Sequence, residues 1–288
     1  MQLAHAAVLA LAVTGCTTVV EVDSGRDAGT DGALDLDGAS PGDAARDAAI
    51  DGGPSTLTPG QSTISVTVAG RARTAILYVP TTATATSQLA IALHGNGDTA
   101  ANFLASSGLR ALADQDGTVL VVPQGIRRDV FVALANQTIP GIDWDGYNTA
   151  AQGNLDVPLL DQLRSQLVAT GQLDARHVFV IGYSQGGYLA FAYGMFAGGS
   201  LACTAVLAAA SGFGGGTTDP LITGAARHLA VALQIGTSDG AFATAQTTST
   251  TLQGRGFPVQ FTPVSGAGHV PIPGDIGGPW RYCRGASL

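Results

Sequence analysis

Charged residues are scarce in this chain, and basic ones are scarcer than acidic ones. Only 12% of its 288 residues are charged, with 13 Lys and Arg against 21 Asp and Glu, so the formal net charge is −8. Nine acidic residues and two arginines lie within residues 17–58, which leaves the rest of the chain at −1. Domains that bind nucleic acid carry a stripe or patch of Lys and Arg. We therefore expect no nucleic-acid partner.

Cysteine and histidine are also few, and their spacing offers no metal site. The three Cys and five His residues are scattered, and neither a Cys-x-x-Cys nor a His-x-x-x-His pair occurs. Zinc-binding sequences bring such pairs together on a loop or a helix face. We therefore expect no bound metal ion.

The apolar segment at the N-terminus is too short to cross a membrane. Residues 6–13 fall well below the roughly 20 residues that span a bilayer, so residues 1–15 are predicted to be a signal peptide. Val13-Thr14-Gly15-Cys16 resembles a bacterial lipobox, in which the cysteine becomes the lipidated first residue. Cys16 is therefore the predicted lipid anchor in the cell envelope, at the outer membrane. Residues 1–5 lack the Lys or Arg with which most export signals begin. A small-x-Cys pattern after a short apolar run is only moderately specific, so plain secretory cleavage and an N-terminal core strand stay open.

Large apolar residues are few in the segment that follows, and aromatic residues are missing from it. Residues 16–58 consist mainly of Asp, Gly and Ala, and such a segment cannot bury enough surface to offset the entropy of ordering. We predict a disordered tether there. Residues 59–288 have the length of a single α/β domain.

Two cysteines remain in this domain, Cys203 and Cys283. Exported proteins fold in an oxidising compartment, where cysteine pairs form disulfides. We therefore predict a Cys203–Cys283 disulfide, with two buried free thiols as the alternative.

Strand-like apolar runs alternate with helical stretches along the domain. Residues 62–68 and 73–79 are predicted to form an antiparallel pair around Ala69-Gly70. Further strands are predicted at residues 89–93, 118–122, 177–181, 204–209, 229–235 and 259–264, and helices at 100–114, 155–169, 185–196 and 242–253. This order predicts an α/β fold with a mostly parallel, doubly wound sheet and an antiparallel N-terminal strand pair.

One pentapeptide, Gly182-Tyr183-Ser184-Gln185-Gly186, stands at a predicted junction of strand and helix. In a Gly-x-Ser-x-Gly elbow the glycines let strand and helix crowd together, which keeps the serine Oγ exposed above the sheet. The chain has 40 glycines, so the motif alone could arise by chance, but its place between strand and helix favours a function. Ser184 is the predicted nucleophile.

A nucleophilic serine needs a histidine base and a carboxylate that orients it. Hydrolases with this elbow place these residues in the order Ser, Asp or Glu, His. His269 follows the last predicted strand and Asp239 follows the strand at 229–235, so both project from carboxyl ends. His228 precedes that strand and is predicted to be structural. Chain order or strand position disfavours the carboxylates of Asp143, Asp145, Asp156, Asp219 and Asp275.

The oxyanion of an acyl-transfer intermediate needs backbone donors, and loss of one donor costs about 3–4 kcal/mol. The N–H of Gln185 is one predicted donor. The second is expected from the backbone of Gly95 and Asn96, because the turn at residues 94–97 follows the strand at 89–93. A histidine that leads into a glycine turn usually braces the turn, so His94 is assigned a structural role.

An aromatic-bearing insertion at residues 131–147 follows a strand whose carboxyl end meets the predicted site. Its Trp144, together with Tyr183 of the elbow, is predicted to line a substrate cleft, because aromatic side chains offer apolar faces to ligands. A packed surface loop is the alternative for this insertion.

Four segments carry a resemblance to a known family: His94–Gly97, Asn154–Leu167, Leu173–Ser184 and Gly266–His269. Over residues 62–284 the chain resembles esterases of the α/β-hydrolase fold that are grouped with polyhydroxybutyrate depolymerases and feruloyl or acetyl-xylan esterases. The resemblance implies that Ser184, Asp239 and His269 are catalytic. It also implies ester hydrolysis through an acyl-enzyme, without metal or organic cofactor, and leaves the identity of the ester open.

Two other functions stay open from the sequence alone. A serine peptidase uses the same machinery on amides, although nothing here resembles the added domain that often gates the substrates of such enzymes. A non-catalytic envelope lipoprotein could keep the fold for binding, but the presence of Ser184, Asp239 and His269 argues against it. The predicted function is a serine carboxylic-ester hydrolase acting on a small or oligomeric ester.

Overall fold

The computed structural model describes residues 54–126, 128–132, 137–142, 144–271 and 275–288. The predicted signal peptide, Cys16, most of the tether and Asp143 lie outside the described residues. The division of the chain into leader, tether and domain therefore stays a prediction. Within the described part, the chain already contacts the domain at Leu57, whose N–H donates to Gln172 Oε1 at 2.6 Å.

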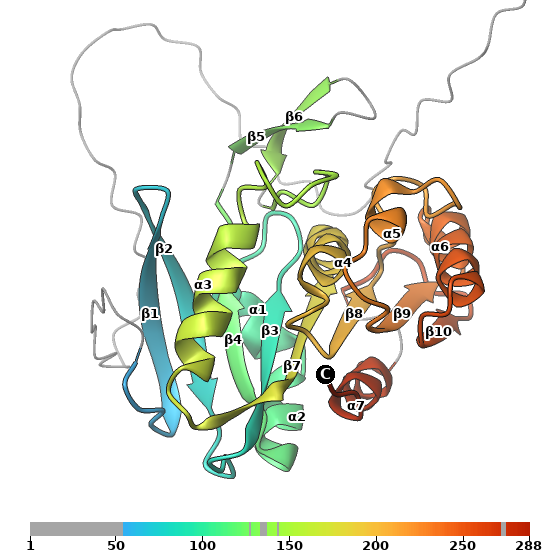
Figure 1. The fold of residues 1–288 in the computed structure, drawn as a ribbon. Helices are drawn as coiled ribbons and strands as arrows, with labels where there is room; N and C mark the ends of the chain where they lie inside the picture. Colours follow the sequence, from blue (N-terminus) through green and yellow to red (C-terminus); the bar gives the residue numbers. More distant parts are fainter. Residues whose placement is uncertain (1–53, 127, 133–136, 143, 272–274) are drawn as a thin grey trace, which may run out of the picture. The chain divides into compact units, whose positions relative to one another are not determined.

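A large sheet forms the centre of the described domain (Figure 1). Its strands are β1 Gly60–Val68, β2 Arg71–Val79, β3 Ser87–Leu93, β4 Val119–Pro123, β7 Leu173–Tyr183, β8 Cys203–Leu207, β9 Ala230–Gly236 and β10 Val259–Val264. The eight strands are ordered β1-β2-β4-β3-β7-β8-β9-β10. β2 is antiparallel to both β1 and β4, and the other neighbouring strands run parallel. The predicted sheet with its antiparallel N-terminal pair is confirmed.

Helices cover both faces of this sheet (Figure 1). They are α1 Ala100–Ser106, α2 Leu109–Asp116, α3 Val157–Val168, α4 Gln185–Ala197, α5 Pro220–Thr223, α6 Phe242–Gly254 and α7 Gly277–Arg284. Side chains of α3, α4, α5 and α6 pack into a core on one face, whereas those of α1, α2 and α7 pack into a core on the other. The described domain is therefore a three-layer α/β structure.

Burial of strand β3 on both faces explains why its sequence is almost continuously apolar. Leu89, Ile91 and Leu93 belong to one core, and the intervening Ala90 and Ala92 belong to the other. All five side chains are completely buried. A strand that is covered on both faces has no solvent-facing position, so the polar alternation of a surface strand is missing.

The structure departs from the predicted elements in three places. The helix predicted at 100–114 is divided into α1 and α2 at Gly108, which has φ +77° and ends the regular helical backbone. The helices α5 and α7 were not predicted, because each is short and begins with glycine or proline. An antiparallel pair that was not predicted, β5 Arg128–Val132 and β6 Gln137–Ile142, begins just before the insertion at 131–147 and extends into it.

Cys203 and Cys283 form a disulfide that joins β8 to α7, as predicted. Both cysteines are buried in the core between the sheet and α7. Within the described ranges, no helix has the length and apolarity that a membrane crossing requires.

Candidate active site

Ser184 occupies the sharp turn between β7 and α4. Its backbone has φ 53° and ψ −119°, a conformation that L-residues rarely adopt and that marks a nucleophile elbow. The turn is held by backbone bonds, since the Ser184 N–H donates to Leu207 O at 2.9 Å. Strain of this kind persists only where the surrounding structure imposes it, and it keeps the Ser184 Oγ above the sheet.

The glycines of the elbow are required by close packing. A Cβ at Gly182 would lie 2.1 Å from Gly186 O, and a Cβ at Gly186 would lie 2.4 Å from the carbonyl oxygens of Leu93 and His94. Both distances are far shorter than a van der Waals contact, and backbone atoms cannot move aside as a flexible side chain can. The elbow therefore fits only glycine at these two positions.

The structure brings together the three residues that the sequence nominates as nucleophile, base and orienting acid. Ser184 Oγ lies 2.8 Å from His269 Nε2, and His269 Nδ1 lies 2.7 Å from Asp239 Oδ2. Because a carboxylate only accepts, Nδ1 carries the proton, which leaves Nε2 to accept from the serine hydroxyl. This is the hydrogen-bond pattern of a serine, histidine and aspartate triad.

Each of these residues follows the carboxyl end of a parallel strand, where ligands of such sheets bind. Ser184, Asp239 and His269 follow β7, β9 and β10, respectively. The loops of the last two strands are tied together, because Ser238 N–H donates to Ala267 O at 2.9 Å. A Cβ at Gly236 would lie 2.2 Å from that same oxygen, so this approach also requires glycine.

Asp239 is ionised under ordinary conditions. Its burial alone would raise the pKa of the carboxyl group. Hydrogen bonds from His269 and from the Ala241 N–H, together with attraction to His269, outweigh burial and hold the pKa below its ordinary value. The ionised carboxylate therefore stabilises the folded state above the pKa of the unfolded chain. That stability is lost as the pH falls through the lower folded pKa.

We therefore expect Asp239→Asn to lower the melting temperature by a constant amount above about pH 5, with the difference shrinking below about pH 4. Thermal unfolding of both proteins between neutral pH and about pH 3 measures this. A difference that grows on acidification would contradict the assigned direction of the pKa shift.

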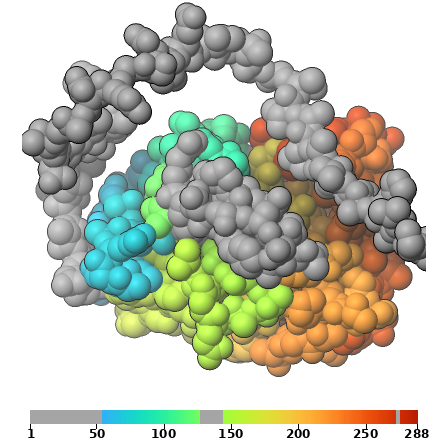
Figure 2. Space-filling model, turned by 90° about the horizontal axis from the view of Figure 1, so that it is seen from above, coloured from blue at the N-terminus to red at the C-terminus, as the bar shows by residue number. Residues whose placement is uncertain are grey.

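A cavity of about 390 Å³ opens beside Ser184 and His269. Its other lining residues are Gly95, Asn96, Gly97, Asp98, Phe103, Ser106, Ser107, Tyr183 and Pro271. The lining is thus made by the turn after β3, by α1 and by the elbow. Figure 2 shows the molecule from above the view of Figure 1, with a yellow-green segment between a cyan one and an orange one.

Tyr183, one of two predicted cleft residues, lines this cavity, and its ring centroid lies 5.7 Å from that of His269. The prediction for Trp144 is wrong. Trp144 is completely buried in a core cluster and does not line the cavity, because its indole N–H donates to His94 O at 2.8 Å.

The predicted oxyanion donors flank Ser184. Gln185 is the first residue of α4, and Gly95 approaches so closely that a Cβ there would lie 3.6 Å from Ser184 Cβ. His94 is buried and braces the turn, with Nδ1 2.8 Å from Gly95 O and Nε2 3.0 Å from the Gly125 N–H. The structural role predicted for His94 is confirmed, whereas the donor roles stay predictions.

Among the described residues, the histidine and carboxylates set aside by sequence form no hydrogen bond with Ser184. His228 stacks on Phe257 with ring centroids 4.4 Å apart, and it lines a separate cavity of about 520 Å³. Asp219 caps α5, and Asp275 pairs with Arg281 at 3.0 Å. Asp145 and Asp156 are buried in a hydrogen-bond network beneath the elbow.

Phe103, Ser106 and Ser107 line the cavity, and sequence reasoning missed them. A usable signal was present, because the helix that directly follows the His94–Gly97 turn must begin beside the elbow. As for metals, the described residues contain no group of three or more His, Cys, Asp or Glu side chains that could hold an ion.

Comparison with known proteins agrees with this fold. Residues 75–269 match the model of the phospholipase/carboxylesterase family of α/β hydrolases. A 128-residue stretch is 32% identical to "Putative esterase NocK" from Nocardia uniformis subsp. tsuyamanensis, covering 43% of this chain and 34% of that protein. The chain thus matches about a third of the length of this curated relative.

Solved structures are similar in fold at low sequence identity. An acetyl xylan esterase from Aspergillus awamori has a TM-score of 0.58 at 15% identity, with 76% of this chain and 98% of that one covered. An S-formylglutathione hydrolase from Agrobacterium tumefaciens has a TM-score of 0.57 at 16% identity, covering 73% and 88%. The poly(3-hydroxybutyrate) depolymerase LpqC from Bordetella parapertussis has a TM-score of 0.52 at 17% identity, covering 78% and 95%. These likenesses establish the α/β-hydrolase fold.

Proposed function

The chain belongs to the phospholipase/carboxylesterase family, and from this premise we propose that it is a serine esterase that works through an acyl-enzyme. One observation carries the proposal. The chain of hydrogen bonds from Ser184 through His269 to Asp239 stands on a strained elbow and opens into a cavity. Binding alone would need neither the strained serine nor a histidine poised to accept its proton.

In the proposed reaction, His269 Nε2 takes the proton of Ser184 as Oγ attacks the ester carbonyl carbon. Asp239 keeps the imidazole oriented and stabilises its charged form. The tetrahedral intermediate collapses when the bond to the alcohol breaks, and His269 returns the proton to the leaving oxygen. Water, activated by His269, then attacks the acyl-enzyme and releases the acid.

Negative charge on the carbonyl oxygen would be stabilised by backbone donors on both sides of Ser184. The N–H of Gln185 lies at the N-terminus of α4, where the helix dipole also favours an anion. The second donor would come from the turn at Gly95 and Asn96. Such preorganised donors usually supply the largest electrostatic part of the rate enhancement.

The cavity suggests the class of ester. Its volume of about 390 Å³ is small for a ligand pocket, and Phe103 closes part of its wall. Asn96, Asp98 and Ser106 place polar groups around it. We therefore propose short-chain acyl esters of polar alcohols as substrates, in line with the acetyl xylan and hydroxybutyrate esters named for proteins of similar fold. Feruloyl esters belong to the same panel, since a ferulic acid esterase also shares the fold.

The function is tested by initial rates on p-nitrophenyl acetate and octanoate, acetylated xylan, methyl ferulate and hydroxybutyrate oligomers, with a p-nitroanilide as the amide control. We expect the short esters to react fastest and the anilide to react slowly or not at all. A fluorophosphonate should abolish the activity. Turnover of the anilide above the esters would favour a peptidase, and a folded protein inactive on every ester would contradict the proposal.

We also propose that the protein is exported and that Cys16 carries the lipid anchor. The lipobox-like Val13-Thr14-Gly15-Cys16 and the disulfide of Cys203 and Cys283 support this. In a bacterial host, growth with an alkyne fatty acid should label the full chain in the membrane fraction. Cys16→Ala should remove the label, and labelling that persists in this variant would overturn the assignment.

A further inference from the structure

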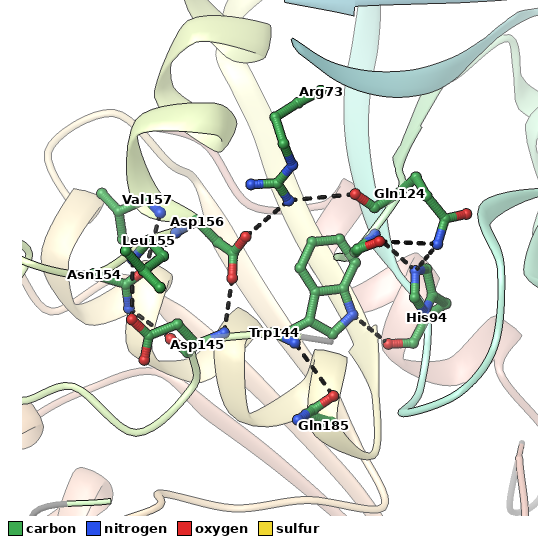
Figure 3. A network of polar contacts seen from close by, with 11 residues as sticks. Arg73, His94, Gln124, Trp144, Asp145, Asn154, Leu155, Asp156, Val157 and Gln185 are labelled. Carbon is green, nitrogen blue, oxygen red and sulfur yellow. Dashed lines mark hydrogen bonds and ion pairs between the residues drawn. The ribbon is translucent and has the colours of Figure 1, made fainter. Parts of the chain in front are cut away.

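A buried hydrogen-bond network lies directly beneath the elbow (Figure 3). It joins segments that the sequence marked separately: the turn at His94, the Trp144-Asp145 pair, the stretch Asn154–Val157 and Gln185. Trp144 stands at its centre in the figure. The triad itself uses none of the side chains in this network.

Trp144 makes two hydrogen bonds that reach the two sides of Ser184. Its indole N–H donates to His94 O at 2.8 Å, and its backbone N–H donates to the side-chain Oε1 of Gln185 at 3.3 Å. The indole also lies against the His94 imidazole, with ring centroids 4.8 Å apart. One completely buried residue therefore links the turn after β3 to the first residue of α4.

The His94 turn decides where the Asn96 N–H points. His94 Nε2 accepts from the Gly125 N–H at 3.0 Å, so Nδ1 carries the proton and donates to Gly95 O at 2.8 Å. In a trans peptide the N–H points opposite to the carbonyl. The carbonyl of the Gly95–Asn96 peptide faces the His94 ring, which turns the Asn96 N–H away from that ring. Asn96 lines the cavity beside Ser184, and its N–H has no partner among the described residues.

The segment that carries Trp144 is itself held in place by Asp156 and by packing against α4. Asp156 Oδ2 accepts the Asp145 N–H at 2.7 Å, and Asp156 Oδ1 accepts from Arg73 Nη2 at 2.9 Å. The side chains of this ion pair are 3% and 0% exposed. A Cβ at Gly146 would lie 2.9 Å from Leu189 N, so the segment is seated directly against α4. Trp144 is thus held in one position relative to the elbow.

We propose that Trp144 is a positioning residue that holds the two halves of the oxyanion hole, the Asn96 N–H and the Gln185 N–H, at a fixed separation. This inference rests on the proposed esterase function. Oxyanion donors act only when they are aimed at the developing charge. Loosening this link therefore reduces the stabilisation of the transition state more than it reduces the binding of the substrate.

The test is Trp144→Phe, which removes the indole N–H and keeps an aromatic ring. We expect kcat for p-nitrophenyl acetate to fall by about tenfold or more, with KM nearly unchanged. The inhibition constant of a trifluoromethyl ketone, which forms a tetrahedral oxyanion adduct on the serine, should rise by a factor similar to the fall in kcat/KM. If Trp144 had a purely structural role, the folded variant would show neither the fall in kcat nor the rise in the inhibition constant.

Trp280→Phe is the matched control. Trp280 is also completely buried, and its indole N–H also donates a hydrogen bond, to Asp116 Oδ2 at 2.7 Å, but it lies on α7. Both variants should lose melting temperature, whereas only Trp144→Phe should lose kcat and affinity for the ketone. Wild-type kinetics in Trp144→Phe, equal kinetic losses in both variants, or a change confined to KM would overturn the assignment.

Gln185→Met provides a second route that leaves Trp144 intact. It removes the acceptor of the Trp144 N–H at nearly constant side-chain length and should also lower kcat at constant KM. If Trp144→Phe does not fold, unchanged kcat in Gln185→Met overturns the proposal. Ser184→Ala in the same assay distinguishes failure of the positioning role of Trp144 from failure of the esterase function. Activity that survives in Ser184→Ala contradicts the esterase mechanism itself.

Discussion

Ser184→Ala is expected to lower kcat for ester hydrolysis by about 10⁵-fold or more, to the level that binding and the oxyanion donors alone can sustain. The physical reason is that the variant lacks the Oγ atom that forms the proposed covalent intermediate. His269 would keep its place, since its Nδ1 still donates to Asp239 at 2.7 Å. The melting temperature should hold or rise slightly, because the substitution removes only the hydroxyl at a strained turn.

The other members of the triad should follow a characteristic pattern. Asp239→Asn should cost less than Ser184→Ala, about 10⁴-fold, because it misorients the base without removing the nucleophile. A Ser184→Ala, His269→Ala double variant should be no slower than either single variant, since the two residues act as a unit. Ser165→Ala on the exposed side of α3 is the control and should retain full activity. Losses that multiply in the double variant would contradict a shared step.

Reduction of the Cys203–Cys283 disulfide is expected to destabilise the domain by about 4 kcal/mol, because the bond closes a long loop in the unfolded chain. The two cysteines are separated by 80 residues, and both lie in the core between the sheet and α7. For a domain of this size, such a loss lowers the melting temperature by roughly 10 °C. Thermal unfolding with and without a phosphine reductant measures the effect.

A Cys203→Ala, Cys283→Ala variant separates the effect of loop closure on stability from the effect of side-chain volume. Reduced wild-type protein keeps both sulfur atoms in the core, whereas the double variant loses them and leaves a small cavity. The variant should therefore melt at or below the reduced wild type, and reductant should not change its melting temperature. Equal melting temperatures for oxidised and reduced wild-type protein would contradict the assigned contribution.

Sequence reasoning nominated Ser184, Asp239 and His269, which the structure brings within hydrogen-bond distance, because each of the three carries its own local signal. The elbow needs glycine at residues 182 and 186 for reasons of packing, and these glycines are visible in the sequence. Asp239 and His269 each follow an apolar run, and parallel strands bring such carboxyl ends to one edge. The prediction did not require knowledge of the contacts between these residues, because the parallel topology brings them to the same edge of the sheet.

The error at Trp144 has a different origin. Whether an aromatic residue in an insertion faces a cleft or the core depends on which distant groups satisfy its N–H. Here the partners are His94 O and Gln185 Oε1, which lie 50 and 41 residues away. Nothing local in Asp143-Trp144-Asp145 distinguishes this outcome from a binding loop. The same holds for the pairing of Arg73 with Asp156, residues 83 positions apart.

The break between α1 and α2 was missed for a smaller reason. An isolated glycine inside a helical pattern is often tolerated, so Gly108 alone did not end the predicted helix. Its φ of +77° lies in the left-handed region, where the helical backbone of α1 cannot continue into α2. The break therefore depends on a backbone conformation that glycine permits but does not require.

Trapping of the acyl-enzyme tests the central claim most directly. Wild-type protein is mixed with p-nitrophenyl acetate, quenched in acid during turnover, and examined by intact-mass and peptide mass spectrometry. The account predicts one added acetyl group per molecule, located on Ser184, and more of this species in Asp239→Asn if deacylation becomes slower than acylation. Turnover with an acetyl group on another residue, or with Ser184 unmodified at every quench time, would contradict it.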